Sequence, residues 1–197
     1  GGLSSGAFLA KAGHKVTVLE KHYRIGGYAH NFKRKGFTFE SGIHTVPFRD
    51  GGVLRGILEQ LGVSDQIETI EYPEMFRYSS PDGDFVIPAK KEEAKAYLYE
   101  QFPDQKEGLD TFFQDIDNLH TNMFTMFDGE KRGYRDENHD FMAQFRGRSY
   151  ETYLRNIFTN ETLYNLFSSQ WPFVAITPEY GANLFLQMLF ATHYHDG

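Results

Sequence analysis

The spacing of apolar and polar residues predicts a helix followed by a strand at the start of the chain. Residues 3–12 are small or helix-forming, with Leu3, Ala7 and Ala10 available for burial, and Gly13 stands where a helix usually ends. The segment "HKVTVLE" then alternates and is rich in β-branched side chains. We therefore predict a strand over 14–20 that ends in an acidic residue.

A weaker β pattern and a short helix follow. The segment "NFKRKGFTFESGIHTV" places Phe32, Phe37 and Phe39 on either side of a basic turn that contains Gly36. Residues 53–62 carry apolar side chains at the spacing of one helical face and end at a glycine. These two patterns predict a β unit and then a helix.

The remainder of the chain is mainly helical. The segment "EMFRYSSPDGDFVIP" predicts two short strands about an "SPDG" turn, because Pro and Gly supply the backbone angles that such turns need. Helical signals follow, of which the last begins with Thr177 as N-cap and Pro178 at the first helical position. They predict helices at about 90–102, 108–127, 149–158, 160–170 and 179–194, with a polar loop over 129–148.

Composition excludes several classes of function. The 20 Lys and Arg residues are outnumbered by 27 Asp and Glu residues, which gives a net charge of −7. No basic stripe is evident, so we expect no nucleic-acid partner and no electrostatic docking on anionic lipid. The chain has no cysteine, which excludes disulfides, thiolate metal sites and cysteine nucleophiles.

The apolar content limits how the protein can meet a membrane. No run of 18 uncharged apolar residues is present in the sequence. We therefore expect a cytoplasmic protein with at most a peripheral, apolar membrane contact. The 19 Phe and 12 Tyr residues call for a large aromatic core or an aromatic pocket.

The opening residues resemble the second half of a dinucleotide-binding unit. Such a unit places a glycine turn at a helix N-terminus that faces a pyrophosphate, and an acid at the end of the next strand binds the ribose. Gly2 would be the third glycine of that turn, Gly6 would allow close packing of the helix, and Glu20 stands close to the expected separation. An ordinary glycine-containing helix start followed by a solvated Glu20 is the alternative interpretation.

The residues after Glu20 decide between these interpretations. In "KHYRIGG", Arg24, Gly26 and Gly27 follow the acid in the order found in the FAD-dependent amine oxidase and phytoene desaturase superfamily, which this chain resembles. The branch of phytoene desaturases, carotenoid isomerases and retinol saturases is the most similar. The segments "GFTFESGIHTV", "YSSPDGDFVIPAKKEEAKAYLYEQFP" and "HYHDG" carry that resemblance, which weakens towards the C-terminus. Members of this family are longer, so we expect a fragment that lacks the first strand and the segment that closes over the flavin.

The resemblance implies an α/β fold with a partial Rossmann-like FAD-binding domain over 1–71 and a helix-rich α+β substrate region over 72–197. It implies an FAD-dependent oxidoreductase that acts on carbon–carbon double bonds of an apolar polyene or isoprenoid, with no catalytic acid or base identified. The cofactor-binding residues that it implies are Gly2, Gly6, Glu20, Lys21, Arg24, Gly26, Gly27 and Gly42. Pocket residues beside the flavin or substrate would be Ser41, His44 and His193.

Several alternatives remain open at the level of sequence. A flavin-dependent polyene cis-trans isomerase, an amine oxidase-like enzyme and an inactive fragment fit the same framework. The aromatic helices could line a polyene tunnel or simply form the core. The "HYHD" segment could line a pocket or end a helix, and we expect no metal there because residues two apart on a helix point in different directions.

Overall fold

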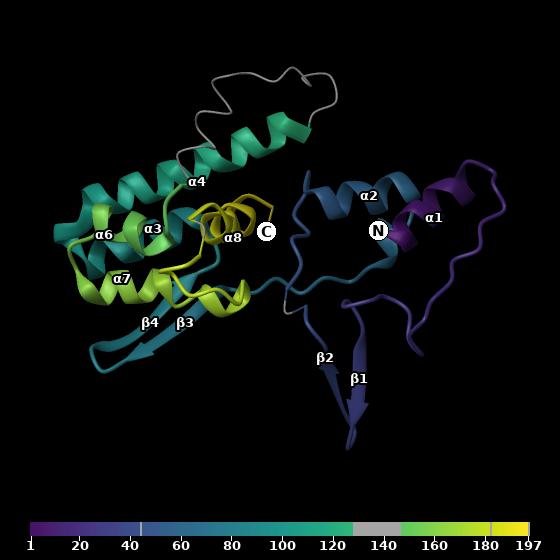
Figure 1. Ribbon diagram of the computed structural model, residues 1–197, viewed down its shortest axis with the longest axis horizontal. Coiled ribbons are helices and arrows are strands. Elements are labelled where there is room, and N and C mark those ends of the chain that lie inside the picture. Colours follow the sequence, from purple (N-terminus) through teal and green to yellow (C-terminus); the bar gives the residue numbers. More distant parts are fainter. Residues whose placement is uncertain (44, 128–146, 182, 197) are drawn as a thin grey trace. The chain divides into compact units, whose positions relative to one another are not determined.

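The computed structural model describes residues 1–43, 45–127, 147–181 and 183–196 (Figure 1). The described residues form two compact units, one made mainly of Gly1–Ile70 and the other of Glu71–His195. Helices are mixed with two small sheets, which agrees with the α/β class at this coarse level. Each unit is a separate body with its own helices and its own hairpin.

The first unit contains two α-helices, a hairpin and a short 3-10 helix. Their bounds are α1 Gly2–Lys11, β1 Asn31–Arg34, β2 Phe37–Glu40, α2 Val53–Leu61 and η1 Ser64–Gln66. The strands β1 and β2 pair antiparallel, with Phe32 opposite Phe39. The turn between them has Lys35 at φ 50° and Gly36 at φ 84°, the left-handed values that a two-residue hairpin turn requires.

The strand predicted over 14–20 is not formed. These residues lie outside both sheets of the described chain, which are the hairpins β1–β2 and β3–β4. A β-strand exists only when a neighbouring backbone completes its hydrogen bonds, and no described segment does so for residues 14–20. The parallel sheet of a Rossmann-like domain is therefore not seen among the described residues.

The second unit packs helices around a two-stranded sheet. Its elements are β3 Glu74–Ser80, β4 Gly83–Pro88, α3 Lys91–Gln101, η2 Pro103–Gln105, α4 Lys106–Phe127, α6 Tyr150–Ile157, α7 Glu161–Ser168, η4 Trp171–Phe173 and α8 Asn183–Asp196. The hairpin forms around the predicted Pro-Asp-Gly turn. The helices lie close to their predicted positions, and Asn160 caps α7 by accepting a hydrogen bond from the Leu163 N–H. The loop predicted over 129–148 lies outside the described residues except at its C-terminal end.

The predicted start of the last helix is wrong. Thr177 does not begin a helix, because residues 178–180 form only a turn, in which the Tyr180 and Gly181 N–H groups donate to the Thr177 carbonyl. The Gly181 carbonyl in turn accepts a hydrogen bond from the Tyr150 N–H at the start of α6. These contacts delay α8 to Asn183.

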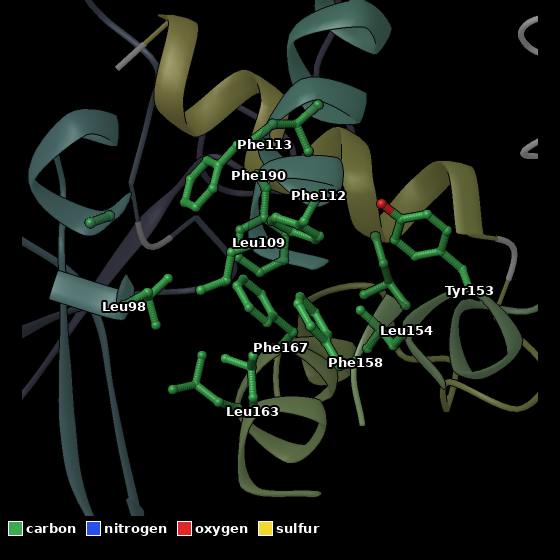
Figure 2. Close-up of a cluster of buried hydrophobic side chains, with 14 of the residues drawn as sticks. Leu98, Leu109, Phe112, Phe113, Tyr153, Leu154, Phe158, Leu163, Phe167 and Phe190 are labelled. Atoms are coloured by element: carbon green, nitrogen blue, oxygen red, sulfur yellow. The ribbon is translucent and has the colours of Figure 1, made fainter. Parts of the chain in front are cut away.

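The hydrophobic core of the protein lies in the second unit. Figure 2 shows Phe112, Phe158, Phe167 and Phe190 gathered from four different parts of the chain. The Phe112 and Phe167 ring centroids are 4.3 Å apart, and Phe158 and Phe167 are stacked at 5.3 Å. The aromatic residues of α4 and α8 that are buried here thus act as core, which is one of the two interpretations left open by the sequence.

The first unit leaves its described apolar side chains exposed or only half-buried. Every buried hydrophobic side chain of the described residues lies at or beyond Phe85. Leu19 and Tyr28, for example, are each 91% exposed. Burial of apolar surface is the main source of folding free energy, so the second unit provides most of the stability.

Candidate functional site

Helix α1 packs directly on the segment that comes after it. A Cβ atom added at Gly6 would lie 3.0 Å from Val18 Cγ2 and 3.5 Å from Val16 Cγ1, so the absence of a side chain permits the contact. These contacts bring residues 16–18, which follow the turn after α1, onto the helix.

Gly1 and Gly2 form the N-terminal end of α1 in this sequence. No described side chain caps it, and a Cβ at Gly1 or Gly2 would meet no atom within 4 Å. The first backbone N–H groups of a helix have no partner within the helix and attract anions. Gly2 therefore places no side chain beside the first backbone N–H groups of α1, whereas Gly6 lies where Val16 and Val18 pack.

Glu20 begins a tight loop that continues to Asn31. Glu20 Oε1 accepts a hydrogen bond of 2.8 Å from the His22 backbone N–H, which fixes the carboxylate close to the main chain. Glu20 and Lys21 are both exposed. The carboxylate can therefore accept further hydrogen bonds from hydroxyl groups of a ligand.

Arg24 closes this loop onto the hairpin. Its Nη1 donates to the Asn31 carbonyl at 2.5 Å and approaches Asn31 Oδ1 at 3.2 Å. The guanidinium is half-buried and has a defined position at the start of β1. Arg24 thus orders the loop that Glu20 begins, in addition to carrying a positive charge.

Gly26 and Gly27 make the sharp turn within the loop. Their φ angles are 114° and 63°, and the Ala29 N–H donates to the Gly26 carbonyl at 3.0 Å. A Cβ at Gly26 would lie 2.9 Å from the Ala29 carbonyl oxygen, whereas a Cβ at Gly27 would meet nothing within 4 Å. At Gly26, glycine is therefore favoured both by the positive φ and by the lack of room for a side chain. At Gly27 it is favoured by the positive φ alone.

The end of β2 brings a second group of predicted residues to the same loop. Ser41 Oγ donates to the Tyr28 carbonyl at 3.2 Å and lies 3.3 Å from His30 Nδ1. His30 Nδ1 is also 2.7 Å from the Gly27 carbonyl, which makes it the donor in that hydrogen bond. A Cβ at Gly42 would lie 3.6 Å from the Tyr28 carbonyl. We call the residues from Glu20 to Asn31, together with Ser41 and Gly42, the glycine loop.

His30 was missed by the sequence reasoning. Its position three residues after Gly27 was the only available signal, because its partner Ser41 is distant in the sequence. His44 lies outside the described residues. His193 belongs to the second unit, where it is half-buried on α8 and its ring meets Tyr194 edge-on at 5.3 Å.

The second unit carries a separate cluster of charged side chains centred on Asp117. Lys91 Nζ lies 2.8 Å from Asp117 Oδ1 and 3.0 Å from Oδ2, and His195 Nε2 lies 2.8 Å from Oδ1. The His195 ring stacks on His120 at 4.2 Å. His195 therefore joins α8 to α4, and the described residues include no group of three or more acidic or histidine side chains able to hold a metal.

A cavity of about 500 Å³ borders this cluster and is lined mainly by polar side chains of α3 and α4. Asp115 is one of them, and burial raises the pKa of its carboxyl although Tyr153 donates a hydrogen bond of 2.8 Å to it. The polar lining differs from what a polyene tunnel needs. The cluster therefore links α3, α4 and α8 through polar side chains.

None of the helices in the described part of the chain combines the length and the apolar character needed to cross a membrane.

Relatives with known activities match the chain over part or all of its length. All-trans-retinol 13,14-reductase from Rattus norvegicus is 34% identical over 119 residues, which are 58% of this chain and 20% of that protein. The same enzyme from Homo sapiens is 35% identical over 120 residues, with the same coverage of both chains. A 4,4'-diapophytoene desaturase from Staphylococcus haemolyticus is 26% identical over 212 residues, which cover 100% of this chain and 42% of the desaturase.

The chain thus spans less than half the length of each of these relatives. No solved structure matches it. The family of flavin containing amine oxidoreductases matches residues 1–191, which include the glycine loop and nearly all of the second unit. The chain therefore belongs to the flavin containing amine oxidoreductase family.

Proposed function

We propose that this chain supplies the adenosine-binding side of an FAD-dependent oxidoreductase that acts on carbon–carbon double bonds of an apolar polyene or isoprenoid. The observation that carries the proposal is the packing of Val16 and Val18 against Gly6, which holds the segment leading to Glu20 against helix α1. A ribose acceptor and a phosphate-binding helix end on one body are the two features that an adenine dinucleotide needs.

The roles of the glycine-loop residues follow from their geometry. Glu20 would accept hydrogen bonds from the ribose hydroxyls, Gly2 would leave room for the pyrophosphate, and Gly6 would allow the close packing of the helix. Arg24, Gly26 and Gly27 would hold the loop in the shape that admits the cofactor. Lys21 would add positive charge near the phosphates, and the first unit would be the partial Rossmann-like domain.

The remaining predicted residues would lie nearer the reacting part of the flavin. Gly42 would admit the flavin ring at close range, and Ser41, His44 and His193 would line the flavin or substrate pocket. The region beyond residue 71 would bind the substrate. A bound flavin supplies the hydride-transfer chemistry, while the protein orients the cofactor and the substrate and excludes water.

The substrate class follows from the relatives. One is named for a reaction on all-trans-retinol and another for the desaturation of 4,4'-diapophytoene. Both names refer to polyene or isoprenoid chemistry, so we assign an apolar small molecule as the substrate of this protein. A polar amine is the alternative class, and assays with both kinds of substrate distinguish the two.

Replacement of Glu20 tests the cofactor site. We expect Glu20→Gln to weaken FAD binding at least tenfold, because hydrogen bonds to a charged acceptor contribute about 1.5–3 kcal/mol each. Quenching of flavin fluorescence on titration of the protein measures the dissociation constant. Glu40→Gln is the matched control, since Glu40 is also an exposed carboxylate and lies at the end of β2. Equal affinities of the two variants would remove Glu20 from the site.

Two further measurements separate the alternatives. Incubation with detergent-dispersed polyenes, followed by product analysis, distinguishes a change in double-bond number from a cis-trans isomerisation. Peroxide release with an amine and no reaction with polyenes would assign the protein to the amine oxidases. A chain that binds no FAD at saturating concentration would be the inactive fragment.

A further inference from the structure

The hairpin β1–β2 has one apolar face. Phe32 and Phe39 are directly opposite each other, and Phe37 follows on the same face because side chains alternate along a strand. The Phe32 and Phe39 rings stack at 5.4 Å, and Phe37 meets Phe39 at 6.5 Å. Their exposed fractions are 37%, 69% and 44% for Phe32, Phe37 and Phe39, so all three rings are accessible.

The tip of the same hairpin is basic. Lys33, Arg34 and Lys35 are consecutive, all are exposed, and they surround the turn at Gly36. Lys35 occupies a left-handed position that disfavours most residues other than glycine, asparagine and aspartate, yet it carries a long cationic side chain there. The tip therefore combines three positive charges with an exposed aromatic residue, Phe37.

We propose that this hairpin tip is a docking element for an anionic lipid bilayer. Aromatic rings favour the boundary between lipid headgroups and acyl chains, and adjacent Lys and Arg side chains are attracted to anionic headgroups. The net charge of the whole chain is −7, so such a membrane repels the chain as a whole and the basic tip would set its orientation. The absence of a basic stripe in the sequence therefore does not exclude local electrostatic docking.

The hairpin also separates the docking tip from the candidate cofactor site. The Ser41 N–H donates to the His30 carbonyl at 3.1 Å at the base of the hairpin, where the glycine loop is. Strands of this length hold the tip roughly 10 Å or more from that base. We infer that docking also lets an apolar substrate enter from the bilayer; this second step rests on the proposed function, whereas vesicle binding can be measured without flavin or substrate.

A tryptophan at the tip would report the contact. Trp171 is the single tryptophan of the chain, so the double variant Trp171→Phe, Phe37→Trp places the only indole on the hairpin. We expect its emission to shift to shorter wavelength with phosphatidylglycerol-containing vesicles and to be quenched by brominated acyl chains. Vesicles of phosphatidylcholine alone should give little change, and salt should weaken the binding to anionic vesicles.

Two variants test the two parts of the contact. Lys35→Asn removes one charge but suits the left-handed turn position, so the hairpin stays formed, and we expect about fivefold weaker vesicle partitioning. Phe37→Ala should weaken partitioning about tenfold by removing apolar surface from the interface. Phe185→Ala is the control, because Phe185 is 60% exposed on α8 and lies outside the hairpin.

Circular dichroism and vesicle co-sedimentation of the 197-residue chain and each variant complete the experiment. Binding that depends on anionic lipid, falls in both hairpin variants and is unchanged in the control supports the proposal. No vesicle binding, or binding equal for neutral and anionic vesicles, overturns it. Binding that the control variant weakens and the hairpin variants do not also overturns it, because another surface would then be responsible.

Discussion

At the scale of single residues, glycines mark the places where two segments approach too closely for a side chain. Gly108 in α4 is such a position, because a Cβ there would lie 2.0 Å from the Ile157 carbonyl oxygen and 2.9 Å from Phe158 Cδ1. Gly56 in α2 is the opposite case, with no atom within 4 Å of a built Cβ. We therefore expect replacement by alanine to change the stability of the protein differently at these two helical glycines.

We expect Gly108→Ala to lower the free energy of unfolding of the second unit by about 1–3 kcal/mol, the usual cost of overpacking a core contact. Urea unfolding followed by far-ultraviolet circular dichroism measures the change in the free energy of unfolding. Gly56→Ala should instead be neutral or stabilising, since alanine favours a helix interior by about 1 kcal/mol over glycine. Similar unfolding midpoints for Gly108→Ala and the unmodified chain would show that α4 and α6 separate without cost.

At the scale of elements, Asp117 joins three helices of the second unit. Lys91 from α3 and His195 from α8 both contact the carboxylate on α4, and His120 of α4 stacks on the His195 ring. The Asp117 charge is already matched by Lys91. A second cation at His195 would therefore gain little attraction and would face both Lys91 and an adjacent imidazole.

This arrangement makes the docking of α8 sensitive to pH. Burial lowers the pKa of His195 below its ordinary value of 6.5, with His120 and Lys91 adding to the shift and Asp117 opposing it. A folded-state pKa below the unfolded value means that the folded state binds fewer protons. The contribution of neutral His195 to the free energy of unfolding is therefore complete above about pH 6.5, and it is lost as the pH falls through the folded-state pKa.

Unfolding in urea between about pH 5 and pH 8, the range in which histidine titrates, tests this expectation. We expect His195→Gln to be less sensitive to acid than the unmodified chain, because glutamine can still donate to Asp117 but does not titrate. His14→Gln is the control, since His14 is exposed and follows α1 in the other unit. The same acid sensitivity in His195→Gln and the unmodified chain would assign the effect to other groups.

At the scale of the whole molecule, stability is unevenly distributed between the two units. The buried hydrophobic side chains of the described residues all belong to the second unit. In the first unit, residues 14–20 have neither a described strand partner nor buried apolar side chains. Local opening is least costly where few apolar contacts hold the backbone.

Hydrogen exchange measured by mass spectrometry should reveal this difference. We expect amides of residues 14–30 to exchange much faster than those of the Lys106–Phe113 part of α4 and of α7, whose side chains form the core. Excess FAD should slow exchange in the glycine loop and leave α7 unchanged, because a ligand stabilises the state that it binds. Strong protection of residues 14–20 without flavin would indicate a strand partner that the described residues do not include.

The sequence by itself determined most local features. The Pro-Asp-Gly turn, the basic Gly36 turn, the helix stop at Gly62 and the positions of most helices all rest on interactions between residues a few positions apart, which a short window of sequence contains. The FAD-binding roles of Gly2, Gly6 and Glu20 rest on the spacing of a dinucleotide-binding motif, those of the other cofactor residues rest on family resemblance, and all of them stay a proposal.

Only the tertiary structure decided the long-range pairings. His195 meets Asp117 across 78 positions and Ser41 meets His30 across 11, distances in sequence that no local periodicity encodes. Thr177 has a good N-cap sequence, yet its carbonyl closes a turn that packs against α6. Residues 14–20 have strand composition, yet no described backbone pairs with them. Propensity sets what a segment can form, and the hydrogen-bond partners that the fold brings within reach decide what it does form.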